Sequence, residues 1–286
     1  MNYRSASEHD TRSARNAPPD DEREFAARGG FWAALTTAGT AAVSLALAVT
    51  TPPRSGPYCR SGCIGSPFTD AAAFVPRDYL WMYPATLLTL LLIVLVACLT
   101  EWVASPRRVL GRIGFAFTTI GAAVLLIDYT IQLTVLQPAL VRGQTDGLAP
   151  WTQYHPFGIF IGLENVGYAV LSLGFIFLGA ALIRSPTRLE RAAAMVFILG
   201  GGLTCAALLV YSMAYRAQLD YRFEVMAILI SWLVLIAAPA MLAVVFARSR
   251  QWPSPPPVSG AAGPVPRPTH WSADPARPRR QGQQPR

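Results

Sequence analysis

Two acidic side chains, Asp128 and Glu164, lie within stretches that are otherwise apolar enough to cross a lipid bilayer. A carboxylate in hydrocarbon is costly, and in membrane proteins it faces a partner, a cavity or a ligand. Two carboxyl groups held close together would share a proton rather than both ionise. The chemistry that these residues offer is therefore proton exchange or the binding of a small ligand.

Polar side chains surround both acids in the sequence. Gln132 lies one helical turn after Asp128, Tyr168 lies one turn after Glu164, and Asn165 stands beside Glu164. We expect these five residues to form a polar pocket within the membrane. The pocket is expected to open toward the outer side.

Two further residues are expected at the rim of this pocket. His155 lies in the loop before the span of Glu164, and Arg222 lies just before the last span, where it could pair with Glu164. Three interpretations of the acids stay open. They fix helix packing through hydrogen bonds, they bind a small ligand, lipid head group or proton, or they form a catalytic or metal centre with His155.

The composition excludes several other functions. The chain is 52% hydrophobic and 14% charged, whereas soluble domains carry about 25% charged residues. All 24 basic residues are arginine. The chain therefore has no lysine to form a Schiff base and none to serve as the lysine of a phosphate-binding loop. The histidines are His9, His155 and His270, too few within spans for haem between two helices. We expect no cofactor and no bound metal.

Six apolar stretches each approach the roughly 20 residues that cross about 30 Å of hydrocarbon. The predicted fold is therefore all-α, a polytopic bundle of six transmembrane helices. Glycines at Gly158, Gly162 and 200–202 are expected to permit close helix approach. The stretches are approximately Phe31–Thr50, Met82–Ala104, Ile113–Leu136, Gly158–Ile183, Ala192–Tyr215 and Val225–Ala247.

The distribution of arginine predicts the orientation of these spans. If the N-terminus is cytoplasmic, 18 of the 24 arginines fall on the inner side, as the positive-inside rule requires. Both termini are therefore predicted to be cytoplasmic, and the net charge of +8 indicates membrane topology, not nucleic-acid binding. At 1.5 Å per residue, Asp128 and Glu164 fall at similar depth in the outer third, on antiparallel neighbours.

The segments outside the spans differ in composition. We predict a disordered cytoplasmic arm over residues 1–30, a transmembrane domain over 31–247 and a disordered tail rich in Pro and Arg over 248–286. Cys59 and Cys63, in the outer loop 51–81, are expected to form a stabilising disulfide, with a redox-active pair as the alternative. The end of the first span also resembles a signal-peptidase site, but we favour an uncleaved span.

Several strings resemble a group of uncharacterised bacterial multi-pass membrane proteins. The strings are Asp78-Tyr-Leu-Trp-Met-Tyr-Pro-Ala, Asp128-Tyr-Thr-Ile-Gln-Leu-Thr-Val-Leu-Gln-Pro, Thr152-Gln-Tyr-His-Pro-Phe-Gly-Ile-Phe-Ile-Gly-Leu-Glu and Tyr221-Arg-Phe-Glu-Val. The resemblance covers roughly residues 55–247. It implies a bacterial origin and a location in the plasma membrane, and it brings no activity with it.

These observations predict an integral membrane protein that uses its polar pocket in transport or sensing. Its partners would be the lipid bilayer and a small-molecule or lipid ligand. One alternative is a membrane enzyme that uses the paired carboxyls as general acid and base on a lipid-like substrate. Another is a structural subunit of a membrane complex.

Overall fold

The computed structural model describes residues 20–103 and 105–250, and this part of the chain contains helices and no strand. Six of the helical segments are long and apolar enough to cross a membrane. The all-α class and the six spans are therefore confirmed. The main helices are α2 (Asp20–Val49), α3 (Met82–Trp102), α4 (Arg108–Ile131), α6 (Ile159–Leu182), α7 (Arg188–Tyr215) and α8 (Arg222–Arg250).

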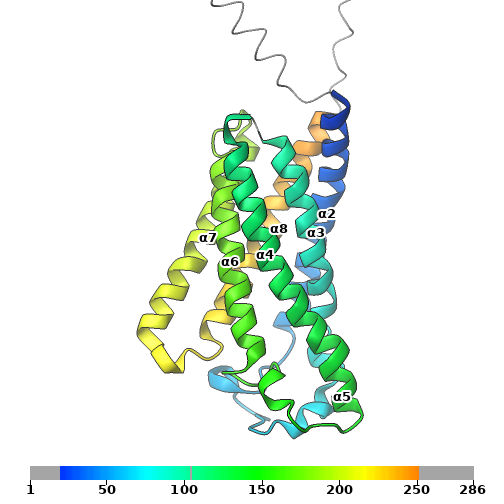
Figure 1. The fold of residues 1–286 in the computed structure, drawn as a ribbon, viewed down its shortest axis with the longest axis vertical. Coiled ribbons are helices and arrows are strands. Elements are labelled where there is room, and N and C mark those ends of the chain that lie inside the picture. Colours follow the sequence, from blue (N-terminus) through cyan, green and yellow to red (C-terminus); the bar gives the residue numbers. More distant parts are fainter. Residues whose placement is uncertain (1–19, 104, 251–286) are drawn as a thin grey trace, which may run out of the picture. The chain divides into compact units, whose positions relative to one another are not determined.

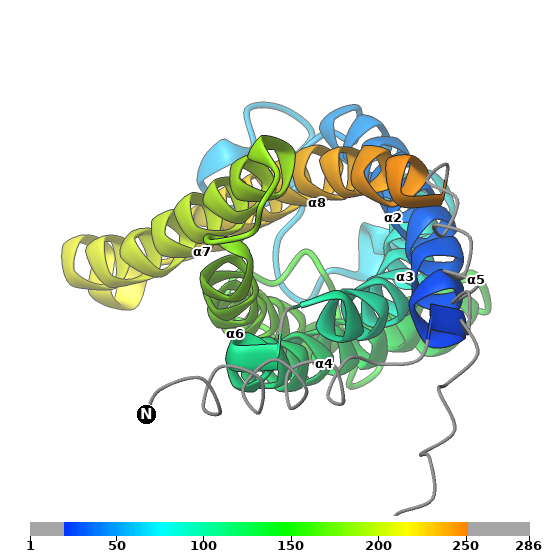
Figure 2. The same ribbon diagram turned by 90° about the horizontal axis from the view of Figure 1, so that it is seen from above.

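The six helices form a ring in which each one packs against the next along the chain, and α8 returns to pack against α2 (Figures 1 and 2). The most extensive contact is between α4 and α6, and α6 also contacts α8 across the ring. Side chains from α4, α6 and α8 can therefore meet inside the bundle. Short turns fill the connections: η1 (Gly56–Tyr58), η2 (Thr69–Phe74), η3 (Arg77–Tyr79), η4 (Ser105–Arg107), η6 (Ala149–Trp151) and η7 (Arg216–Gln218).

The third span is longer than the sequence predicts. After α4 the helix continues through a π-helical turn, η5 (Gln132–Leu136), and then through α5 (Gln137–Val141). A π-helical turn inserts an extra residue into the helical ladder, and such turns are frequent at functional sites. This one begins one turn after Asp128.

The predicted domain boundaries also shift. The helix α2 begins at Asp20, inside the segment 1–30 for which we predict a disordered arm, and α8 continues to Arg250. Acidic residues open α2, and negative charge favours a helix N-terminus. Residues 1–19 of the arm and 251–286 of the tail lie outside the described residues.

Glycine permits the close approach of α4 to α6. A Cβ added at Gly121 would lie 2.8 Å from both the Gly167 carbonyl oxygen and the Leu171 nitrogen, which are backbone atoms of α6. At Gly174 it would clash with the Thr118 hydroxyl of α4. By contrast, nothing lies within 4 Å of a Cβ at Gly162. Close approach was predicted at Gly162, but this glycine is not at a helix contact.

Three connections form a cap over the end of the bundle that lies opposite the start of α2 and the end of α8 (Figure 1). We call this the capped end, and it comprises residues 50–81, 142–158 and 216–221. Asp78 is 1% exposed, and its Oδ2 accepts hydrogen bonds from Arg54 Nε at 2.9 Å and from the Tyr154 hydroxyl at 3.3 Å. Burial raises the pKa of Tyr154, so its phenol keeps the proton that it donates. The cap is therefore held by a buried ion pair.

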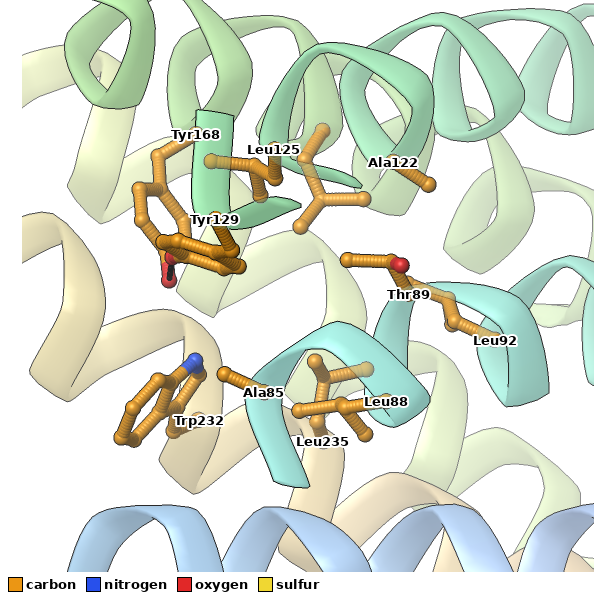
Figure 3. Close-up of a pocket in the computed structure, with 11 residues that line it drawn as sticks. Ala85, Leu88, Thr89, Leu92, Ala122, Leu125, Tyr129, Tyr168, Trp232 and Leu235 are labelled. Carbon is orange, nitrogen blue, oxygen red and sulfur yellow. Dashed lines mark hydrogen bonds between the residues drawn. The ribbon is translucent and has the colours of Figure 1, made fainter. Parts of the chain in front are cut away.

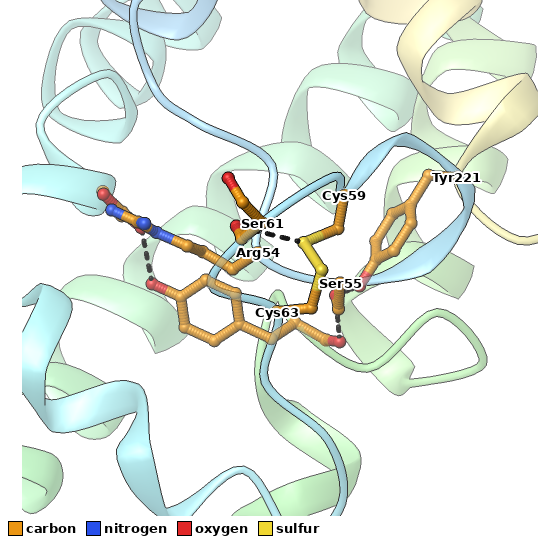
Figure 4. The surroundings of a disulfide bond; sticks show 8 residues. Arg54, Ser55, Cys59, Ser61, Cys63 and Tyr221 are labelled. Atoms are coloured by element: carbon orange, nitrogen blue, oxygen red, sulfur yellow. Dashed lines mark hydrogen bonds and ion pairs between the residues drawn. A yellow bond between two sulfur atoms is a disulfide. The ribbon is translucent and has the colours of Figure 1, made fainter.

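A second contact ties the cap to the start of α8. Ser55 Oγ donates to the Tyr154 carbonyl oxygen at 2.6 Å and lies 2.7 Å from the Tyr221 hydroxyl, which also lies 3.1 Å from the Gln153 carbonyl oxygen (Figure 4). The segment that carries Ser55 continues into a disulfide between Cys59 and Cys63, whose Cα atoms are 5.9 Å apart. The cap thus fixes the position at which α8 enters the bundle.

Replacing Ser55 by alanine should loosen this connection. Ser55→Ala leaves the buried Tyr154 carbonyl without its donor, so we expect a loss of about 1–2 kcal/mol in the free energy of unfolding. Denaturant titration in bicelles measures the loss. The exposed Ser61 is the matched control, and Ser61→Ala should change nothing; equal losses in both variants would contradict the role given to Ser55.

Candidate functional site

Three acidic residues from three helices meet inside the bundle. Asp128 lies on α4, Glu164 on α6 and Glu224 on α8, and their exposed fractions are 1%, 0% and 8%. The Glu224 side chain lies within hydrogen-bonding range of Glu164, and Asp128 lies close enough to interact electrostatically with both. We call these three residues the carboxyl cluster.

The carboxyl cluster is short of hydrogen-bond donors and of positive charge. Asp128 Oδ2, Glu164 Oε2 and Glu224 Oε2 are buried and receive no hydrogen bond from another group. Within the described residues, the ion pairs join Arg54 to Asp78 and Arg222 to Asp220, and none involves the cluster. An ionised carboxylate can only accept hydrogen bonds, so a hydrogen bond between Glu164 and Glu224 would require a proton on one of them.

A chain of hydrogen-bonding side chains leads from the cluster into the bundle. The Tyr129 hydroxyl donates to Glu164 Oε1 at 2.9 Å and lies 2.8 Å from the Tyr168 hydroxyl. Trp232, on α8, lines the same cavity as Tyr129 and Tyr168. Each hydroxyl can both donate and accept a hydrogen bond, so the two tyrosines extend the hydrogen-bonded network of the cluster into the bundle.

This chain ends at a small cavity that is aromatic on one side and aliphatic on the other (Figure 3). The cavity volume is about 20 Å³, which is room for about one water molecule. It is too small for a lipid head group or an organic ligand. Its lining comprises Ala85, Leu88, Thr89, Leu92, Ala122, Leu125, Tyr129, Tyr168, Leu171, Trp232 and Leu235.

Aromatic rings enclose the tyrosine chain. The Trp81 ring lies 5.4 Å from the Tyr129 ring and 5.8 Å from the Trp232 ring, and Phe160 lies 6.3 Å from Tyr129. Trp81 and Phe160 are themselves buried. The rings exclude bulk water from the tyrosines, and charge interactions are stronger where water is excluded.

The predicted pocket residues divide into two groups. Glu164 and Tyr168 join the hydrogen-bonded chain described above. Gln132 is buried, but its Nε2 donates to the Trp151 carbonyl oxygen at 2.6 Å and so ties the third span to the cap. Asn165 is half-buried with its Oδ1 unpartnered, and one residue along a helix turns the side chain by about 100° away from Glu164.

The two predicted rim residues make other contacts. His155 Nδ1 accepts a hydrogen bond from the Phe157 backbone N–H at 3.1 Å, and its ring packs 5.4 Å from Phe68. Arg222 pairs with Asp220 at 2.9 Å and lies over the Tyr215 ring, so its partner is not Glu164. In the described residues, no three His, Cys, Asp or Glu side chains are placed to hold a metal ion.

Glu224, Tyr129 and Trp232 belong to the site and were not predicted from the sequence. Glu224 reads as part of the charged turn with Arg222, but it is buried and on the inner face of α8. The signal was the spacing, because Glu224 and Trp232 are eight residues apart and so share a helix face. Tyr129 directly follows Asp128 in the sequence, and its position alone did not mark it as part of the site.

No protein-family model, curated protein or solved structure matches this chain. The resemblance carried by the quoted strings stays a prediction. The function has to be inferred from the geometry of the carboxyl cluster.

Proposed function

We propose that this integral membrane protein binds protons at the carboxyl cluster and uses them in transport or sensing. The observation that carries the proposal is the meeting of Asp128, Glu164 and Glu224 inside a bundle of membrane-spanning helices, with no ion-pair partner in the described part of the chain. Intramembrane acids of this kind mark proton relays and ion pathways.

A proton fits the site better than the other ligands considered. The adjoining cavity has room for about one water molecule, which disfavours an organic molecule or a lipid head group. Protonation also satisfies the cluster directly, because a neutral carboxyl gains a donor for a neighbouring carboxylate. The Tyr129 hydroxyl can hydrogen-bond Glu164 in either protonation state, because a phenol donates to a carboxylate and accepts from a protonated carboxyl.

The placement of the protein in the cell forms part of the proposal. The arginine distribution supports cytoplasmic termini in a bacterial plasma membrane. In that orientation the capped end faces outward, and the cluster lies in the outer half of the membrane. Glu224, with 8% of its surface exposed, is the member of the cluster through which protons from the outer side would enter.

Counting protons tests the proposal. After a jump to alkaline pH, detergent-solubilised wild type should release at least one more proton per chain than the variant Asp128→Asn/Glu164→Gln/Glu224→Gln. An indicator dye measures the release. Glu101, an exposed acid at the end of α3, gives the control variant Glu101→Gln, which should match the wild type. Equal release from the wild type and the triple variant would refute the proposal.

A further inference from the structure

The end of the bundle opposite the cap carries a dense group of arginines, and we call it the arginine end. Two short connections and the helix starts that follow them supply these arginines: Arg107, Arg108 and Arg112 around the start of α4, and Arg184, Arg188 and Arg191 around the start of α7. The stretches 105–112 and 184–191 contain one acid, Glu190. Its carboxylate is buried and accepts hydrogen bonds from Trp102 at 2.8 Å and Thr187 at 2.7 Å.

The two connections meet at the seam between α4 and α6. Arg107 Nη1 donates to the Ala180 carbonyl oxygen at 3.4 Å, in the last turn of α6. Arg184 lies two residues beyond the end of α6, in the turn that follows it. On α4, Arg112 follows Arg108 by one turn. Three guanidinium groups from the first connection and one from the second are thus gathered at the end of one seam.

These guanidinium groups have unused hydrogen-bonding capacity. Arg108 Nε is buried without a partner, and Arg112 and Arg184 are exposed. Among the residues that the structure describes, none of the six arginines forms an ion pair.

An apolar surface continues from the arginines along the same seam. Phe117 of α4 and Phe177 of α6 stack across it, with ring centroids 5.7 Å apart and an interplanar angle of 15°. At 1.5 Å per residue along the helix axis, Phe117 lies about 8 Å from Arg112 toward the middle of the bundle. Phe177 lies about 10 Å from Arg184 in the same direction. That depth is the depth of acyl chains. Val109, beside the arginines, is 67% exposed.

We propose that the seam between α4 and α6 binds an anionic phospholipid at the arginine end. Its phosphate would lie among Arg107, Arg108, Arg112 and Arg184, and an acyl chain would lie against Phe117 and Phe177. Guanidinium groups bind phosphate oxygens through paired hydrogen bonds, and basic pockets between membrane helices bind anionic head groups. This site is separate from the carboxyl cluster and does not depend on its function.

Nanodiscs of defined composition test this site. Full-length protein is placed in phosphatidylcholine alone or in equal parts phosphatidylcholine and phosphatidylglycerol. We expect the anionic lipid to raise Tm by several degrees, and Arg107→Gln/Arg184→Gln to lose at least half of that shift. Native mass spectrometry should show at least tenfold less phosphatidylglycerol retained by the variant. Arg112→Gln, which removes an exposed arginine, serves if the double variant does not fold.

A matched control removes the same charge elsewhere. Arg77 and Arg142 are exposed at the capped end, and Arg77→Gln/Arg142→Gln should keep the full shift. Equal loss in both double variants would mean general surface attraction and would overturn the proposal. A shift produced by inorganic phosphate in phosphatidylcholine discs would also overturn it, because the site would then bind free phosphate.

Discussion

Glu164→Gln should abolish the proton release of the cluster and leave the free energy of unfolding within about 1 kcal/mol of the wild type. The glutamine carbonyl can still accept the hydrogen bond from Tyr129, which joins the Glu164 position at 2.9 Å. The glutamine NH₂ can donate to Glu224, as a protonated carboxyl would. The substitution thus keeps the contacts and removes the proton.

The companion variant Glu164→Ala distinguishes the loss of a proton-binding group from the loss of side-chain contacts. It leaves Glu224 and Tyr129 without their shared partner and opens a cavity in a fully buried site, so we expect a loss of about 2–4 kcal/mol. SDS titration in bicelles measures both variants. If Glu164→Gln were as unstable as Glu164→Ala, the carboxyl would be structural. If it released protons like the wild type, Glu164 would not hold the released proton.

Gly121→Ala should be the most damaging methyl addition on the α4 side of the bundle. The new Cβ would lie 2.8 Å from two backbone atoms of α6, and backbone cannot rotate away as a side chain can. We expect a loss of about 2–3 kcal/mol in the free energy of unfolding. Asp128 lies two turns further along α4, so separation of the helices should also reduce proton release.

Gly162→Ala provides the control on α6. Nothing lies within 4 Å of a Cβ at this position, and alanine has a higher helix propensity than glycine. The variant should be as stable as the wild type or slightly more stable. A destabilisation equal to that of Gly121→Ala would contradict the close packing of α4 against α6.

The spans follow from the sequence because hydrocarbon imposes a length and a composition that apolar runs reveal directly. The polar contacts of the site depend on helix rotation, which the sequence constrains less. Asp128 and Glu164 stand out because acids are rare in apolar runs. Glu224 stands two residues after Arg222 in a charged turn, and only the rotation of α8 turns it inward.

Helix rotation also decides which glycines lie at a helix contact, and the sequence does not predict it. Gly162 and Gly121 both lie in apolar helices, and the sequence alone gives no reason to separate them. One faces away from the other helices and the other meets the backbone of α6. In the same way, Arg222 has the right height to pair with Glu164, but Asp220, two residues away, is its partner.

The infrared spectrum of the reconstituted protein at neutral pH tests the central claim most directly, because a protonated carboxyl and a carboxylate absorb at different frequencies. We expect a protonated-carboxyl band in the wild type that shifts in D₂O and disappears in Glu164→Gln/Glu224→Gln. A wild-type spectrum without that band, or a band unchanged in the double variant, would contradict proton binding at the carboxyl cluster.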